Sequence, residues 1–282
     1  MSHPEAIAWL EGRWGHPDEL TLPLSERGLL LADGVFETVL VLHGQPQLLH
    51  AHLERWQRSA ALLHLPTPPD ASVVEPLIQA AITRSGINAG ALRLNWSRGA
   101  SARGLTVPAP GGERCWLQLS PVTPLLSPVT VIVSHHERRN ASSRLSQAKR
   151  FDYSQAIAAR SEAIAVGASD ALLMSSAGGL CCGTAANLLL HCGSRWLTPA
   201  LASGCLPGVM RQRALNLGLA QESEAPLEPE ALLSCDGAVL LNSLGCRPIS
   251  QLGPTALAQL ADGGALFAAL LGSPQAEVSE PG

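Results

Sequence analysis

The spacing of apolar residues changes several times along the chain, and each change predicts an element of secondary structure. The β-branched and aromatic run from Val35 to Val41 predicts a strand, and His43 with Gly44 predicts the hairpin turn behind it. Between residues 50 and 65 the apolar side chains recur every three or four positions, which predicts a helix with one buried stripe. A proline-rich stretch follows and ends this helix.

The same periodicities predict further elements in both halves of the chain. Strands are expected at about 8–14, 91–97, 115–119, 129–134, 170–174, 180–183, 187–192 and 237–242, and helices at 72–85, 209–219 and about 254–271, with another near Pro229. A helix is also expected after Lys149, with Ala156, Ile157, Ala163 and Ile164 on its buried face. Strands followed by helices, without strict alternation, indicate the α+β class.

Three prolines between residues 121 and 128 interrupt this pattern. Proline continues neither a helix nor the interior of a sheet, so we interpret 121–128 as a linker between two domains. The N-terminal α+β domain would then span residues 1–120, and the C-terminal α+β domain residues 129–282. A chain of 282 residues is long enough for two domains.

The composition argues against several classes of function. An apolar fraction of 46% and a charged fraction of 15% are typical of a folded globular protein. The net charge is −4 and the basic residues are scattered, so no nucleic-acid partner is expected. The seven cysteines lack C-x-x-C spacing, so neither a metal nor a disulfide framework is expected. Without a signal-peptide pattern or a membrane-length apolar stretch, a cytoplasmic protein without a membrane partner is expected.

Lys149 carries the clearest candidate chemistry. It directly precedes an alanine-rich helical run in a chain that is poor in lysine. A lysine buried where two elements meet can hold a desolvated amine with a lowered pKa, as Schiff-base chemistry requires. A solvated lysine near a helix start is the ordinary alternative, so the residue alone does not decide its role.

Four separated groups of residues give Lys149 a context. They are Asp33 to Thr38, His52 to Trp56 with Ser59-Ala60, Lys149 with 167–173, and 184–188 with Thr198-Pro199 and 206–211. Together and in this order they resemble the class IV aminotransferases, the fold-type IV pyridoxal-phosphate enzymes, and the resemblance covers roughly residues 8–250. Within this family the chain looks most like the aminodeoxychorismate lyases, on 97–99 with 103–104, 185–188, 208–212 and 242–244.

The resemblance implies a two-domain fold of the D-amino acid aminotransferase type, with pyridoxal 5'-phosphate bound between the domains, in a homodimer. Lys149 would hold the cofactor through its amine and then move protons. Arg55 would bind the cofactor's phosphate, because a guanidinium donates hydrogen bonds in a planar fork, and a solvated charge opposite the Leu53/Trp56 stripe is its alternative role. Tyr153, the only tyrosine in the chain, would hydrogen-bond the 3-oxygen of the cofactor, and simple packing is its alternative role.

Other cofactor contacts follow from the same resemblance. The backbone N–H groups of Val209 and Met210 at a predicted helix start, and the hydroxyl of Ser243, would add to the phosphate site. Ordinary turns are the alternative at both places. Counting five residues back from Asn187, the family's glutamate for the pyridine nitrogen falls on Cys182. A neutral thiol holds a pyridinium less firmly than a carboxylate does, which favours elimination over transamination.

The resemblance therefore implies a lyase of folate biosynthesis that converts 4-amino-4-deoxychorismate to 4-aminobenzoate and pyruvate. Arg98 and Arg103 are candidates for the two carboxylates of this small-molecule substrate, and a loop-surface role is the alternative for either. Two other functions stay open. One is a pyridoxal-phosphate-dependent transaminase of the branched-chain or D-amino acid type, and the other is a homologue whose activity is reduced by Cys182.

Overall fold

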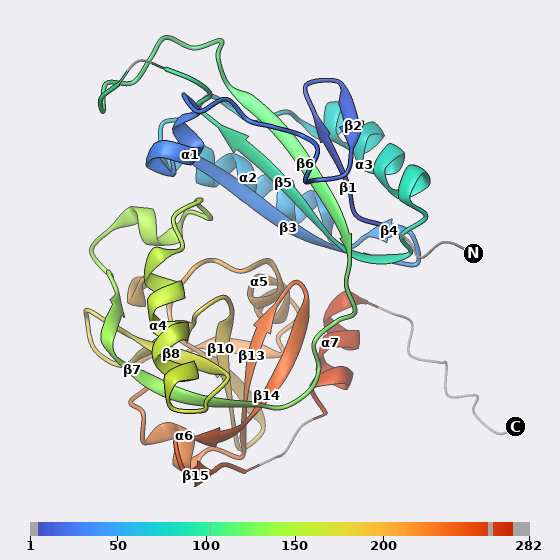
Figure 1. Cartoon of the computed structure of the whole chain (residues 1–282). Helices are drawn as coiled ribbons and strands as arrows, with labels where there is room; N and C mark the ends of the chain where they lie inside the picture. The colour runs from blue at the N-terminus through green and yellow to red at the C-terminus, as the bar shows by residue number, and fades with distance from the viewer. Residues whose placement is uncertain (1–4, 102, 259–261, 273–282) are drawn as a thin grey trace, which may run out of the picture. The chain divides into compact units, whose positions relative to one another are not determined.

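The computed structural model describes residues 5–101, 103–258 and 262–272. Packing divides the chain into two compact units, and each contains helices and sheet, which confirms the α+β class (Figure 1). The first unit consists of Met1–Thr123 and Asn140–Ile157, and the second of Pro124–Arg139 and Ala158–Gly282. Within the described residues, every helix is too short or too polar to cross a membrane.

The first unit is built on an antiparallel sheet of six strands in the order β2-β1-β6-β5-β3-β4. Helices α2 and α3 pack on one face of this sheet (Figure 1), around a core that includes Val39, Trp56 and Ile78. The strands are β1 (Ile7–Leu10), β2 (Arg13–Gly15), β3 (Gly34–Leu42), β4 (Gln45–Pro46), β5 (Ala89–Ser97) and β6 (Arg114–Pro121), and the helices are α1 (Arg27–Leu31), α2 (Leu49–Leu62) and α3 (Ala71–Ser85).

Along β3 and β5, side chains point alternately to the two faces of the sheet, and this determines which residues lie on each face. Val35 on β3, and Leu92 and Leu94 on β5, belong to the core under α2 and α3. Successive residues of a strand point to opposite faces, so Phe36 and Arg93 lie on the face turned away from that core. The predicted strand at 35–41 and helix at 50–65 are confirmed, with small shifts at their ends.

The described residues of the second unit form nine strands in the order β12-β11-β10-β13-β14-β7-β8-β9, with β15 attached to β14. Strand β9 also pairs with β10 through Cys182 and Asn187, and this pair closes the six strands from β10 to β9 into a ring. Leu172, Leu188 and Leu240 lie in its core. The strands are β7 (Val129–Arg139), β8 (Asp170–Ser175), β9 (Leu180–Gly183), β10 (Asn187–Cys192), β11 (Arg195–Thr198), β12 (Ala220–Glu222), β13 (Gly237–Asn242), β14 (Gly245–Leu252) and β15 (Thr255–Ala256), and the helices are α4 (Ser154–Ala165), which begins in the first unit, α5 (Val209–Asn216), α6 (Ala231–Ser234) and α7 (Gly263–Leu271).

The predicted buried face of helix α4 is wrong at two positions. Ile157 and Ile164 are 63% and 64% exposed. The helix instead buries Ala159 and Ala163, which belong to a core cluster with Leu173 of β8. An alanine side chain is short, so the helix backbone can lie close to the strand on this face, and the larger isoleucines remain outside.

The predicted helix at about 254–271 is wrong in its first half. Thr255–Ala256 form β15 instead, antiparallel to the end of β14 across Gly253. Gly253 has a φ of 55°, a backbone conformation that glycine adopts without strain. Helix α7 begins only after Asp262, whose side chain caps its N-terminus, and residues 259–261 lie outside the described residues.

The domain ranges 1–120 and 129–282 stay predictions. One packing fact bears on them: the segment Asn140–Ile157, which carries Lys149, belongs to the first compact unit although it follows the expected linker at 121–128. The chain thus returns to the first unit after β7, and long-range pairing of this kind leaves no local signal in the sequence.

Candidate active site

The segment around Lys149 is fixed by its backbone against the start of β3. The carbonyl oxygen of Lys149 accepts a hydrogen bond from the N–H of Phe36 at 2.9 Å, and the N–H of Phe151 donates to the carbonyl of Gly34 at 3.0 Å. The N–H of Lys149 donates to the hydroxyl of Ser59 on α2 at 3.1 Å. A Cβ atom on residue 34 would lie 2.2 Å from the Phe151 ring, so glycine is required there.

The amine of Lys149 lies among aromatic rings. Its Nζ atom donates to the hydroxyl of Tyr153 at 3.1 Å and lies 4.3 Å from the centre of the Phe36 ring. The rings of Phe36 and Tyr153 also contact each other, with centroids 5.5 Å apart. The predicted pair is thus brought together, although Tyr153 precedes α4 instead of lying on it. An amine held this way can attack a carbonyl carbon or exchange a proton with a neighbouring group.

Arg93 belongs to the same cluster and was missed from the sequence. Its guanidinium lies over the Phe36 ring, 3.6 Å from the ring centre, and its Nε donates to Asn95 Oδ1 at 2.7 Å. Burial lowers the pKa of Arg93, and the proximity of Tyr153 opposes this. The available signal was one arginine between two leucines, Leu92 and Leu94, in a predicted strand.

Arg55 lies within a buried ionic cluster between α2 and β3. Its Nε donates to Glu37 Oε1 at 2.8 Å and its Nη2 donates to Glu37 Oε2 at 2.6 Å. The Nδ1 atom of His52 lies 2.7 Å from the same Oε2, and all three side chains are buried. Because an ionised carboxylate only accepts, Nδ1 of His52 carries the proton in this contact.

The pKa values of this cluster follow from its contacts. Burial alone would raise the pKa of Glu37, but the charge and hydrogen bonds of Arg55, with those of His52, lower it to about 2. Burial lowers the pKa of His52 despite the bond to Glu37. Glu37 is therefore an anion that fixes the guanidinium plane of Arg55.

The two arginines predicted for the substrate lie in different surroundings. Arg98 is buried, and its Nε donates to Asp33 Oδ2 at 2.8 Å. Its Nη1 and Nη2 donate to the carbonyls of His64 and Leu63 at 3.0 Å each, where they bind the C-terminal end of α2. Arg103 is exposed on the loop after β5. These contacts give Arg98 a structural role, and the substrate role of both arginines stays a prediction.

In the second unit Cys182 lies on β9. It is 8% exposed and stands opposite Leu173 of β8 and Asn187 of β10. The neighbouring thiol of Cys181, which faces Cys182 and Cys205, has a raised pKa because of its hydrogen bond with Cys182. A largely buried sulfur atom therefore occupies the position predicted to meet the pyridine nitrogen.

The N-terminus of α5 is shaped by Asn187. The side chain of Asn187 donates from Nδ2 to the carbonyl of Leu206 at 2.9 Å. A Cβ atom on residue 208 would lie 2.0 Å from Asn187 Oδ1, so only glycine fits at this N-cap. Gly208 offers no capping side chain, and Val209 and Met210 form the first turn of α5. Uncapped N–H groups at a helix start can bind an anion.

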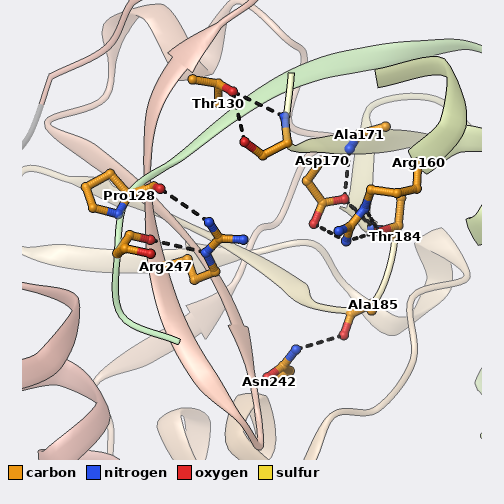
Figure 2. A network of polar contacts seen from close by, with 11 residues as sticks. Pro128, Thr130, Arg160, Asp170, Ala171, Thr184, Ala185, Asn242 and Arg247 are labelled. Carbon is orange, nitrogen blue, oxygen red and sulfur yellow. Dashed lines mark hydrogen bonds and ion pairs between the residues drawn. The ribbon is translucent and has the colours of Figure 1, made fainter. Parts of the chain in front are cut away.

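Ser243 lies in the turn between β13 and β14. Asn242 holds this turn, since its Oδ1 accepts from the N–H of Leu244 at 2.8 Å. Its Nδ2 donates to the carbonyl of Ala185 at 3.2 Å, as Figure 2 shows. Ser243 is thereby tied to the turn that joins β9 to β10.

Comparisons with known proteins identify the family that the chain resembles. The family model described as amino-transferase class IV matches residues 34–252. The chain is 26% identical over 247 residues to the aminodeoxychorismate lyase of Bacillus subtilis strain 168, an alignment that covers 84% of this chain and 83% of that protein. It is 38% identical over 96 residues to a bifunctional aminodeoxychorismate lyase and D-amino acid transaminase of Mycobacterium tuberculosis, which covers 33% of each protein.

A solved structure supports the fold. The branched-chain amino acid aminotransferase of Escherichia coli superimposes with a TM-score of 0.84 over 98% of both chains, at 18% identity. At that identity the likeness concerns the fold alone.

Proposed function

Because the chain belongs to the class IV aminotransferases, we propose that it is a lyase that converts 4-amino-4-deoxychorismate to 4-aminobenzoate and pyruvate. Enzymes of this family depend on pyridoxal 5'-phosphate; one solved structure of the same fold contains this cofactor, and another contains its amine form, PMP. The relatives that share sequence with the chain include both lyases and transaminases, so the choice of reaction rests on the residues of the chain itself.

The observation that carries the proposal is the position of the Lys149 amine. Lys149 is the only lysine in the sequence. Its Nζ lies 3.1 Å from the Tyr153 hydroxyl and 4.3 Å from the centre of the Phe36 ring. A primary amine beside a phenol suits the aldehyde and 3-oxygen of pyridoxal phosphate, so these residues fit the cofactor.

Lys149 has two tasks in the proposed reaction. Its amine would hold the cofactor and, when the substrate amine takes that place, would accept the proton from the ring carbon that bears the substrate amine. Bound pyridoxal phosphate withdraws electrons from the carbon that loses this proton. The enolpyruvyl group then leaves with the C–O bond electrons, takes up a proton and becomes pyruvate, while the ring becomes aromatic. Tyr153 orients the amine of Lys149 throughout.

The phosphate is assigned to groups of fixed geometry. Arg55 has its guanidinium plane fixed by Glu37. The N–H groups of Val209 and Met210 lie at the start of α5, and the hydroxyl of Ser243 is tied to the β9–β10 turn through Asn242. Backbone N–H groups and a guanidinium are suitable donors for a phosphate dianion.

Arg93 is the substrate contact that the geometry supports best. The substrate carries two carboxylates, and Arg93 shares the Phe36 ring with Lys149. A partly desolvated guanidinium binds a carboxylate more strongly than one in water does. Arg98 and Arg103 remain candidates for the second carboxylate.

Cys182 is the reason to prefer the lyase. A thiol gives the pyridine nitrogen a weaker partner than a carboxylate would. Transamination needs a strong electron sink in both of its half-reactions, whereas the elimination is driven by aromatisation of the product. A transaminase of the branched-chain or D-amino acid type is the second candidate, and a homologue of reduced activity is the third.

A homodimer is part of the proposal. In the first unit Leu24, Leu29, Leu30 and Leu105 are 60% or more exposed. These leucines lie on or near α1, because Arg27 of α1 donates to the carbonyl of Gly104. An apolar surface of this kind favours association with a second copy.

One set of assays separates the candidates. The purified protein is incubated with pyridoxal phosphate, reduced with borohydride and digested, and the phosphopyridoxyl group is expected on Lys149. Aminodeoxychorismate should then yield 4-aminobenzoate and pyruvate. Formation of glutamate from an amino acid and 2-oxoglutarate, without any 4-aminobenzoate from aminodeoxychorismate, would reject the lyase in favour of the transaminase.

A further inference from the structure

The turn between β9 and β10, residues 184–187, connects three groups that the proposed function assigns to the cofactor. Cys182 lies on the strand that enters the turn and pairs with Asn187 at its end. Asn187 also packs against Gly208 at the start of α5. Asn242, which precedes Ser243, donates to the carbonyl of Ala185. A displacement of this turn would therefore move all three groups.

A polar cluster fixes the turn at its first residue (Figure 2). The hydroxyl of Thr184 donates to Asp170 Oδ1 at 2.6 Å, and the Thr184 N–H lies 3.3 Å from the same oxygen. Arg160 of α4 donates from Nη2 to Asp170 Oδ2 at 2.6 Å and from Nε to the Thr184 hydroxyl at 3.0 Å. Asp170 is 4% exposed and Thr184 is 8% exposed, so water does not compete freely for these bonds.

The Thr184 hydroxyl connects Asp170 and Arg160 through hydrogen bonds. It gives its single proton to Asp170 and accepts from Arg160, so both of its hydrogen-bonding functions are used. A valine has the same shape but can do neither, whereas a serine can do both. A buried carboxylate that loses one partner is costly, so removal of the hydroxyl should displace the turn.

From these contacts we infer that Thr184 is a positioning residue of the cofactor site. Held by Asp170 and Arg160, it fixes the 184–187 turn, and through that turn it sets the places of Cys182, Ser243 and the α5 N-terminus. This inference rests on the proposed function, because it concerns the binding of pyridoxal phosphate. Thr184 itself touches neither cofactor nor substrate in this role.

The test compares Thr184→Val with Thr184→Ser in the full-length protein. The dissociation constant for pyridoxal phosphate is measured from the visible absorption that develops when the Lys149 amine binds the cofactor, and the melting temperature is measured without cofactor. We expect Thr184→Val to weaken cofactor binding about tenfold and Thr184→Ser to stay within about twofold of wild type. Arg160→Gln, at a partly exposed position, should weaken binding in the same direction and covers the case in which Thr184→Val does not fold.

Thr130→Val is the matched control. Thr130 lies in the same unit, where its hydroxyl is 3.2 Å from both the hydroxyl and the N–H of Ser169, the residue before Asp170, and it has no part in the hydrogen bonds described for Thr184 (Figure 2). Its cofactor affinity should equal that of wild type. If all variants lose affinity only in proportion to their melting temperatures, Thr184 merely stabilises the fold and the inference is overturned.

Two further outcomes separate the inference from the proposed function. If wild type takes up pyridoxal phosphate on Lys149 and Thr184→Val binds it equally well, the inference fails and the proposed function stands. If wild type takes up no cofactor on Lys149, the proposed function fails and the inference fails with it.

Discussion

The Lys149 cluster of the first unit and the 184–187 turn of the second hold their candidate ligands in opposite ways. Around Lys149 the side chains with chemistry touch each other: Lys149 meets Tyr153, and Arg93 shares the Phe36 ring. At the turn, the side chains that bond each other, Thr184, Asp170 and Arg160, are not assigned to a ligand. Asn187 binds the backbone carbonyl of Leu206, next to the N–H groups at the start of α5. Substitutions should therefore act on chemistry in the first region and on position in the second.

Among these substitutions, loss of the only lysine should have the largest effect on activity. Lys149→Ala removes both the amine that holds the cofactor and the base that moves the proton. We expect lyase activity to fall at least about 1,000-fold, since positioned proton transfer alone contributes roughly 10²–10⁴. The measurement is 4-aminobenzoate formation together with visible absorption. Arg195→Ala, at an exposed position of β11, is the control, and equal activity in both variants would contradict the assignment.

The buried cluster at Glu37 should respond in stability. Glu37→Gln leaves Arg55 without a charged partner inside the protein, which we expect to cost about 3–5 kcal/mol of unfolding free energy. Chemical denaturation measures the loss. Glu11→Gln removes an exposed ion pair with Arg114 and should cost less than about 1 kcal/mol. Similar losses in the two variants would show that the cluster at Glu37 is not buried in solution.

The same cluster predicts a pH dependence. The pKa of Glu37 is lowered from 4.5 to about 2 in the folded chain. Its contribution, on the order of 3 kcal/mol, is therefore present above pH 4.5 and is lost as the pH falls from 4.5 towards 2. Unfolding at stepped pH should show this decline in wild type. In Glu37→Gln that part of the decline should be missing, and an identical slope in both would refute it.

Substitutions of Arg93 and Arg98 should distinguish an arginine that binds the substrate from one that stabilises the fold. Arg93→Met should raise the KM for aminodeoxychorismate roughly tenfold or more, because a hydrogen bond to a charged group is lost. Arg98→Met should mainly lower the melting temperature, since Arg98 binds Asp33 and the end of α2. A KM change in Arg98→Met without a stability loss would reverse the two roles.

The smallest effect is expected at Cys182. Cys182→Glu should raise the ratio of transamination to lyase activity about tenfold, because a carboxylate holds the pyridinium by a charge-assisted hydrogen bond. Cys182→Ser keeps a neutral partner and should leave the ratio near that of wild type. An unchanged ratio in Cys182→Glu would defeat the argument that the thiol favours elimination.

Local pattern in the sequence predicted most of the elements but not how distant ones meet. The strand at 35–41 was predictable because its β-branched and aromatic residues are contiguous in one stretch of chain. Strand β14 was not predicted. It pairs with the neighbouring β13 on one side and, on the other, with β7, which lies more than a hundred residues earlier in the chain, and such a distant pairing has no local sequence signal. Ile157 and Ile164 were misplaced because helix α4 packs on its alanines.

The site shows the same division. Lys149 and Tyr153 were predicted and lie together, since they are four residues apart. Arg93 was missed because an arginine in a strand usually faces solvent, and only the pairing of β3 with β5 brings it over Phe36. The polar cluster on Thr184 joins residues from α4, β8 and the 184–187 turn, so the sequence contains no local spacing that predicts it.

The ring of strands in the second unit also governs how the protein resists aggregation. An unpaired sheet edge can add a strand from another molecule. The pairing of Cys182 with Asn187 covers β9, so in the described part of the ring that edge is closed. The outer strand β12 ends the sheet beyond β11, and it has only three residues, one of them the charged Glu222. A short, charged border is a poor template for strand addition, which favours a protein that stays dispersed at high concentration.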